Sequence, residues 1–223
     1  MRSDCIGVTI ADRDFTLCSP GGIYDPSTET LFIADTHFGK DASFRHHAIP
    51  VPTGSTEATL RKIEKMLCRL TAKRLVILGD MFHDRNSLSK ETLKHLDEFF
   101  ETHQRIDHFL VPGNHDSDIR LIPKHWSLQI IQSGTYLDGL TLSHFPVTSD
   151  QMERIVLCGH LHPAIRIGTG NDQLKLPCFL YRDQNLILPA LGDFTGTEVI
   201  RTRSGDQVWV IADEEVVTIK TEF

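Results

Sequence analysis

Five short segments between residues 35 and 162 carry carboxylate, imidazole and amide side chains at close spacing. Most of them directly follow a run of apolar residues that predicts a β-strand. In an open α/β sheet, ligands bind beyond the carboxyl ends of the strands, so we expect these side chains to meet in one crevice. The segments are Asp35-Thr36-His37, Gly79-Asp80-Met81-Phe82-His83, Gly113-Asn114-His115-Asp116, Ser143-His144 and Gly159-His160-Leu161-His162.

The donor atoms of these segments define the kind of chemistry they could support. Oxygen and imidazole donors without thiolate suit divalent ions such as Mn²⁺, Fe²⁺ or Zn²⁺, and a carboxylate can bridge two of them. Two such ions, about 3.5–4 Å apart, bind both the attacking and the leaving oxygen of an in-line displacement and lower the pKa of bound water. Phosphoester hydrolysis needs both effects, so the pattern predicts a two-metal phosphoesterase.

The order of the segments resembles the calcineurin-like metallophosphoesterase superfamily. The resemblance implies a four-layer α/β/β/α sandwich, with two facing mixed sheets flanked by helices. It implies that Asp80 bridges the two metals and acts in catalysis, and that His115 lies near the phosphate as general acid or transition-state stabiliser. Asn114 and His83 would also contact the substrate, and His83 is a catalytic candidate. The implied metal ligands are Asp35, His37, Asp80, Asn114, His144, His160 and His162.

Two positions depart from the wider superfamily pattern. Ser143 precedes His144 where many relatives have Gly, which changes the local turn and leaves the ligand in place. The Asp that orients the catalytic His in phosphatases is replaced by His83. We therefore expect either Asp84 or Asp116 to be the partner of His115.

Further stretches are similar to the bacterial ligase-associated DNA damage response endonucleases. This resemblance implies cleavage of DNA, preferably single-stranded, in repair, with Mn²⁺ as the favoured metal. It also implies functional association with an ATP-dependent DNA ligase and a helicase, and Arg45 is the basic residue we expect to contact substrate. The stretches are residues 38–45, 49–54, 176–179 and 188–196.

The acidic balance of the chain argues for an alternative substrate. The formal net charge is −7, whereas proteins that hold DNA by electrostatics usually carry a basic face. A small nucleotide or cyclic nucleotide is therefore the alternative substrate. A scaffold without metals is disfavoured, because a competent residue fills every ligand position and His115 is present.

Length and composition predict one cytoplasmic domain spanning residues 1–223. No segment approaches the ~18 consecutive apolar residues of a membrane span, and the N-terminus lacks the apolar core of a signal peptide. Five cysteines without Cys-x-x-Cys spacing are expected to be reduced. Of these, we expect Cys68 and Cys158 to be small buried hydrophobic residues.

The apolar spacing also predicts the elements that position the segments. Strands are expected at residues 31–34, 75–78, 109–111, 140–142 and 155–158, each ahead of one polar segment. Amphipathic helices are expected around residues 60–70, behind possible caps at Ser55 and Thr56, and at 89–102. Because Pro50 and Pro52 cannot continue a helix, residues 42–55 are expected to form a loop. After His162, short strand-like runs separated by Gly, Asn and Asp predict hairpins of a second sheet.

Overall fold

The first sheet is half antiparallel and half parallel. The computed structural model describes residues 4–117, 119–148, 154–169 and 172–219. In this part of the chain the sheet runs in sequence order, antiparallel from the first strand to the fourth and parallel from the fourth to the seventh. Its strands are β1 (Cys5–Ile10), β2 (Arg13–Cys18), β3 (Gly22–Asp25), β4 (Thr30–Ile33), β5 (Arg74–Leu78), β6 (Asp107–Val111) and β7 (Leu128–Ile130).

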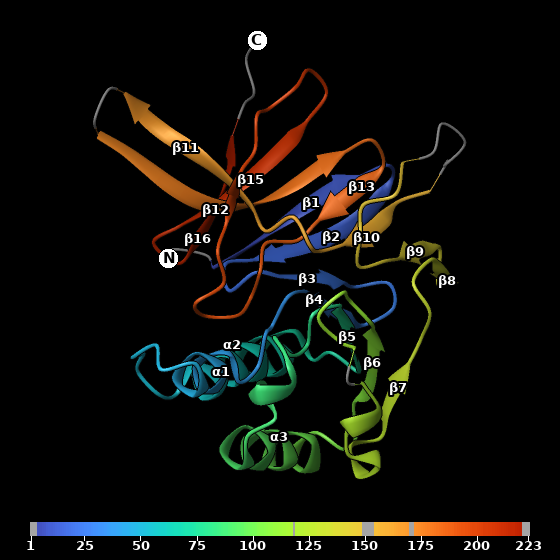
Figure 1. Ribbon diagram of the computed structural model, residues 1–223. Coiled ribbons are helices and arrows are strands. Elements are labelled where there is room, and N and C mark those ends of the chain that lie inside the picture. Colours follow the sequence, from blue (N-terminus) through green and yellow to red (C-terminus); the bar gives the residue numbers. More distant parts are fainter. Residues whose placement is uncertain (1–3, 118, 149–153, 170–171, 220–223) are drawn as a thin grey trace.

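Three α-helices pack on one face of this sheet: α1 (Lys40–His46), α2 (Ser55–Leu70) and α3 (Lys90–Thr102) (Figure 1). Successive side chains of a strand point to opposite faces, so Leu31 and Ile33 of β4 join the core under the helices while Phe32 faces the other way. Ile63 and Leu67 of α2 are buried in the same core. Burial on both faces explains why the parallel strands are continuously apolar in the sequence.

The second sheet faces the first and continues beyond its edge. Phe179, Leu186 and Leu157 lie in the core between the two sheets, whereas Cys178 and Leu180 belong to a third cluster on the outer face. The order of the strands is β14-β11-β12-β13-β10-β9-β8, with β15 and β16 joined through β12. Their bounds are β8 (Thr135–Leu137), β9 (Leu140–Leu142), β10 (Val156–Cys158), β11 (Pro163–Thr169), β12 (Asp172–Arg182), β13 (Asn185–Ile187), β14 (Glu198–Val199), β15 (Gln207–Ala212) and β16 (Glu215–Ile219).

The predicted α/β sandwich of two facing mixed sheets is confirmed. Within the described residues, all three α-helices lie beside the first sheet, and the third core cluster lies on the outer face of the second sheet (Figure 1). The described helices also include none long and apolar enough to cross a membrane.

The helix predictions hold for α2 and α3, and one loop prediction is wrong. Ser89 caps α3 by accepting the backbone N–H of Thr92, whereas α2 begins after Gly54 without a side-chain cap. Residues 42–55 were expected to form a loop, but the first part belongs to α1, which ends at His46. Pro50 and Pro52 lie after this helix, and residues 40–46 contain no proline that would prevent a helical turn.

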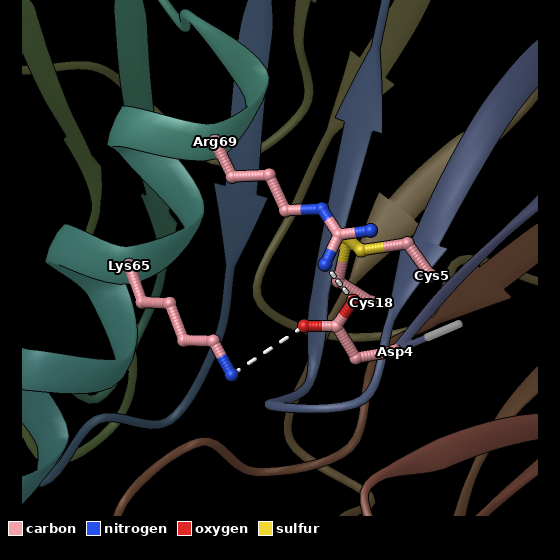
Figure 2. The surroundings of a disulfide bond; sticks show 5 residues. All are labelled: Asp4, Cys5, Cys18, Lys65 and Arg69. Atoms are coloured by element: carbon pink, nitrogen blue, oxygen red, sulfur yellow. Dashed lines mark hydrogen bonds and ion pairs between the residues drawn. A yellow bond between two sulfur atoms is a disulfide. The ribbon is translucent and has the colours of Figure 1, made fainter. Parts of the chain in front are cut away.

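The cysteines also differ from expectation. Cys5 and Cys18 are direct cross-strand partners at the ends of β1 and β2 and form a disulfide, so the prediction that all five cysteines are reduced is wrong. Figure 2 shows the disulfide beside Asp4, whose carboxylate pairs with Arg69 and lies 3.4 Å from Lys65 Nζ. These contacts connect the first strand to α2. Cys158 is buried as expected, but Cys68 is exposed.

His108, at the amino-terminal end of β6, makes stability depend on pH. Burial among the rings of Phe99 and Phe100 lowers the pKa of His108 to about 4, from an ordinary value of 6.5. Between these two pH values the unfolded chain takes up a proton that the folded protein does not, so stability falls as pH falls through this window. From pH 7 to pH 5 the loss from this residue is about 2 kcal/mol.

We expect His108→Leu to reduce the fall in the free energy of unfolding between pH 7 and pH 5 by this amount. The measurement is urea unfolding at both pH values with a chelator present, so that metal binding does not contribute. The control is His46→Leu, which removes an exposed histidine. An unchanged pH dependence in His108→Leu would show that His108 is not the group responsible.

Candidate two-metal site

The polar segments meet where the strand ends of the two sheets come together. Backbone hydrogen bonds join the turns after β4 and β5, from Asp35 N to Gly79 O (3.1 Å) and from His37 N to Asp80 O (2.9 Å). Another joins the turns after β9 and β10, from Gly159 N to His144 O (3.1 Å). The loop after β13 crosses to the first sheet through Leu191 and Gly192, whose N–H groups donate to Ala34 O and Asp35 O.

Six of the predicted ligands form two groups in this crevice. In each group, one possible ligand atom per residue lies within 4.8 Å of the others. The two groups are Asp35, His37 and His162, and Asp80, His144 and His160.

Asn114 and Asp80 complete and connect these groups. Asn114 Oδ1 lies 3.1 Å from His144 Nε2, which places the seventh predicted ligand at the second group. Asp80 Oδ2 lies 3.5 Å from His144 Nε2 and 3.9 Å from His37 Nε2. The carboxylate of Asp80 therefore stands between the groups, where a bridging ligand would have to be.

The hydrogen bonds of the first group leave two acceptors facing each other. His162 Nδ1 lies 3.0 Å from the carbonyl oxygen of Gly196 and must carry the proton, because a carbonyl only accepts. His162 Nε2 is then 3.2 Å from Asp35 Oδ1, and both atoms are buried without a hydrogen-bond partner. Burial lowers the pKa of His162, but the Asp35 carboxylate outweighs it and the net shift is upward. This position thus attracts positive charge.

The second group also contains a histidine whose ring is fixed by a backbone carbonyl. His144 Nδ1 lies 3.0 Å from Leu78 O, so the proton is on Nδ1 and the Nε2 lone pair faces inward. Around Nε2 lie Asn114 Oδ1 at 3.1 Å and His160 Nδ1 at 3.2 Å. An imidazole that donates its outer N–H to a backbone carbonyl and directs its other nitrogen to a shared point is typical of a metal ligand.

His37 is neutral in this environment. Burial lowers the pKa of His37 to about 2, with further lowering by Lys40 and by neighbouring imidazoles. His37 Nδ1 is also buried without a hydrogen-bond partner. A neutral imidazole, paired carboxylates and an amide oxygen fit two borderline divalent ions, so the residues present suit the metals implied by the sequence.

Backbone strain recurs in these turns, although no residue type in the pattern indicates it. A positive φ costs a non-glycine residue free energy and is found where the surroundings or the function require it. Five of the seven predicted ligands have a positive φ: Asp35 (52°), His37 (42°), Asp80 (49°), His160 (68°) and His162 (45°). The turns therefore aim the side chains at the crevice at the expense of backbone stability.

His115 is held by a backbone group and by neither predicted carboxylate. His115 Nδ1 lies 2.7 Å from His83 O, and the two rings stack with their centroids 5.0 Å apart. Asp116 instead accepts the N–H groups of Gly113 and Phe82, and Asp84 caps a short 3-10 turn at residues 85–87. The expectation that Asp84 or Asp116 would orient His115 is therefore wrong, since a side-chain pattern cannot reveal a carbonyl partner.

The basic residues near the site differ in their placement. Arg45 Nη1 pairs with Asp41 Oδ2 at 3.0 Å on α1, and Arg45 belongs to neither ligand group. Lys40 is buried, and the pKa of its amine is lowered by burial while Asp80 and Asp35 act in the opposite direction. Lys40 is thus the cation in electrostatic contact with the ligand carboxylates. Its position after His37 was visible in the sequence, but its burial was not.

Comparison with known proteins agrees with this geometry. A family model for calcineurin-like phosphoesterases matches residues 28–193, so the chain belongs to the calcineurin-like phosphoesterase family and is a metal-dependent phosphoesterase. Proteins of this family bind a dinuclear metal centre, and the chain has two candidate metal sites. Comparison with curated protein sequences found no match.

Among solved structures, the chain is similar to the nuclease MPE of Pseudomonas putida. The identity is 28%, the TM-score is 0.83, and the match covers 96% of this chain and 100% of the nuclease. A protein of unknown function from Aquifex aeolicus (22% identity, TM-score 0.41, 60% and 78% covered) and the phosphoesterase Yfce from E. coli (17%, 0.44, 85% and 97%) also match. The nuclease match agrees with the resemblance to ligase-associated endonucleases.

Gly79 provides a test of the site without removing a ligand. It has φ of 87°, and a Cβ atom there would lie 2.0 Å from His144 Nδ1. We expect Gly79→Ala to displace His144 and abolish tight Mn²⁺ binding, measured by calorimetry and by metal content.

Gly134→Ala is the matched control, because Gly134 has φ of 88° and open space around it. Both variants should lose about 1–2 kcal/mol of stability from the positive φ, Gly79→Ala should lose more from the contact with His144, and only Gly79→Ala should lose metal. Wild-type Mn²⁺ affinity in Gly79→Ala would contradict the assignment of His144 as a ligand.

Proposed function

We propose that this protein is a dinuclear-metal-dependent DNA endonuclease that cuts single strands during DNA repair in the cytoplasm. The observation that carries the proposal is the pair of ligand groups joined at Asp80, with His115 beside them. The full-length likeness to a nuclease supports nucleic acid as the substrate. The proposed metal ligands are those predicted from the sequence, with Mn²⁺ favoured and Fe²⁺ or Zn²⁺ as alternatives.

Two divalent ions held by these ligands would bind oxygens of the phosphodiester and lower the pKa of the attacking water. His115 would donate a proton or a hydrogen bond to the leaving oxygen or to a phosphoryl oxygen. Its Nδ1–H donates to His83 O, which fixes the ring and leaves Nε2 for the substrate. When Nε2 is protonated, it can donate to the leaving oxygen or to a phosphoryl oxygen.

The surrounding residues position this histidine and the phosphate. Asp80 Oδ1 accepts the backbone N–H of His115 at 2.9 Å, so one carboxylate both joins the ligand groups and fixes the catalytic residue. His83 packs on the ring of His115. Burial lowers the pKa of His83, and the positive charge of Lys40 lowers it further, so His83 would contact the substrate as a neutral ring. Asn114 is proposed to contact the phosphate, and Arg45 the substrate from the rim at α1.

Several wider assignments belong to the same proposal. Residues 1–223 would act as one domain, since Phe15 of β2 and Trp209 of β15 share the core between the sheets. Association with an ATP-dependent DNA ligase and a helicase rests on the resemblance to ligase-associated endonucleases. The net charge of −7 favours the second candidate, a phosphohydrolase of small nucleotides or cyclic nucleotides.

Circular single-stranded DNA separates these two functions. We expect the purified protein to linearise the circle with Mn²⁺ and Asp80→Asn to be inactive, because an amide cannot replace the bridging carboxylate. Asp183→Asn is the matched control, since Asp183 is exposed and has the same φ of 49° as Asp80. Intact circles alongside rapid hydrolysis of cyclic nucleotides would support the small substrate.

The role of His115 predicts a specific kinetic loss. His115→Ala should retain both metals and slow cleavage by roughly 10²–10⁴-fold, the usual range for a positioned proton donor. The loss should be smaller for an aryl phosphodiester, whose leaving group needs no proton. His125→Ala, at an exposed histidine on the 3-10 turn Lys124–Trp126, serves as control. Full activity in His115→Ala would remove this residue from the mechanism.

A further inference from the structure

An exposed phenylalanine borders the second ligand group. Phe145 directly follows His144, and its ring centroid lies 4.7 Å from that of His144 and 4.5 Å from that of His160. The side chain nevertheless remains 42% exposed. A single exposed apolar residue is ordinary on a protein surface, but this one packs against two candidate metal ligands, His144 and His160.

The backbone around Phe145 is held in place. Ser143 Oγ donates to the carbonyl oxygen of Phe145 at 2.6 Å. Two residues further, the side-chain amide of Asn185 both accepts from Val147 N and donates to Val147 O. The ring is thus presented at the edge of the crevice by a fixed segment, and stacking on it would cost little ordering entropy.

A second exposed phenylalanine lies on the loop that closes the first ligand group. Phe194 is 44% exposed and has φ of 58°, a strained conformation for a bulky side chain. The loop is held on both sides, because Gly192 N donates to Asp35 O and Gly196 O accepts from His162 Nδ1. Strain in an exposed aromatic residue without core packing points to a role outside the fold.

We propose that Phe145 and Phe194 form a base-stacking subsite, in which unpaired nucleobases on either side of the reacting phosphate stack on the two phenyl rings. This inference rests on the proposed nuclease function and names the residues that would select single strands. Stacking on an aromatic ring requires no positive charge and tolerates any base, because every base has a π-face. It therefore gives an acidic protein affinity for a polyanion. Paired bases in a duplex are already stacked on their neighbours, so a duplex could not bind this subsite.

The test compares two substrates with the same backbone charge: a thymidine tract, and a tract of equal length built of abasic tetrahydrofuran nucleotides. Wild type should cleave the thymidine tract with the higher kcat/KM. Phe145→Leu and Phe194→Leu keep apolar cover but cannot stack. Each should lower kcat/KM on the thymidine tract by about 5–100-fold and change it less than about 2-fold on the abasic tract.

Tyr136→Leu is the control. Tyr136 lies on β8, and its exposed aromatic ring packs against Arg154. This substitution should leave both rates unchanged. Equal losses on the two tracts in Phe145→Leu, with metal content retained, would show that the ring only supports the histidines and would overturn the subsite. Hydrolysis of an aryl phosphodiester without cleavage of either tract would overturn the nuclease function itself, and the subsite with it.

Discussion

The central constraint of this structure is that the fold packs candidate ligand atoms against one another at two points of the crevice. His162 Nε2 faces Asp35 Oδ1, and His144 Nε2 faces Asn114 Oδ1. In each histidine the other ring nitrogen already donates to a backbone carbonyl, so the ring cannot turn to satisfy the contact without losing that hydrogen bond. A bound cation, or a proton on the imidazole, satisfies such a contact, and the raised pKa of His162 reflects the same demand for positive charge. The fold thus prepares two positive-charge sites before any metal enters.

The rest of the architecture serves to keep these atoms together. Two sheets deliver strand ends to one crevice, and backbone hydrogen bonds between the turns hold the ligands in register. Positive φ angles at most of the ligand positions oppose this arrangement, and the buried cores between and beside the sheets stabilise it. Gly79 permits the closest approach, since no side chain fits between it and His144. Strain and close approach at one place are what a preorganised site requires.

The sequence predicted those features that depend on local pattern. Strands β4, β5 and β6 are buried on both faces and so appear as continuous apolar runs, and α2 and α3 show amphipathic spacing. Features set by distant contacts were not predictable. The Cys5–Cys18 disulfide depends on the register of β1 and β2, and the partner of His115 is a carbonyl that carries no residue signature. Helix α1 was not predicted, because Pro50 and Pro52 exclude a helix only at their own positions and α1 ends before them.

The same distinction applies to charge. Net charge is a property of composition, whereas a phosphate experiences the local field of a few groups. Lys40 is buried and interacts electrostatically with Asp80 and Asp35. Because the dielectric constant is low there, its charge interacts more strongly with nearby groups than the charge of an exposed lysine. Arg45, which the sequence favoured, is largely neutralised by Asp41. Under the proposed function, an acidic chain would hold a phosphodiester at this crevice because bound metals and one buried amine supply the positive charge and exposed aromatic rings supply contacts to the bases.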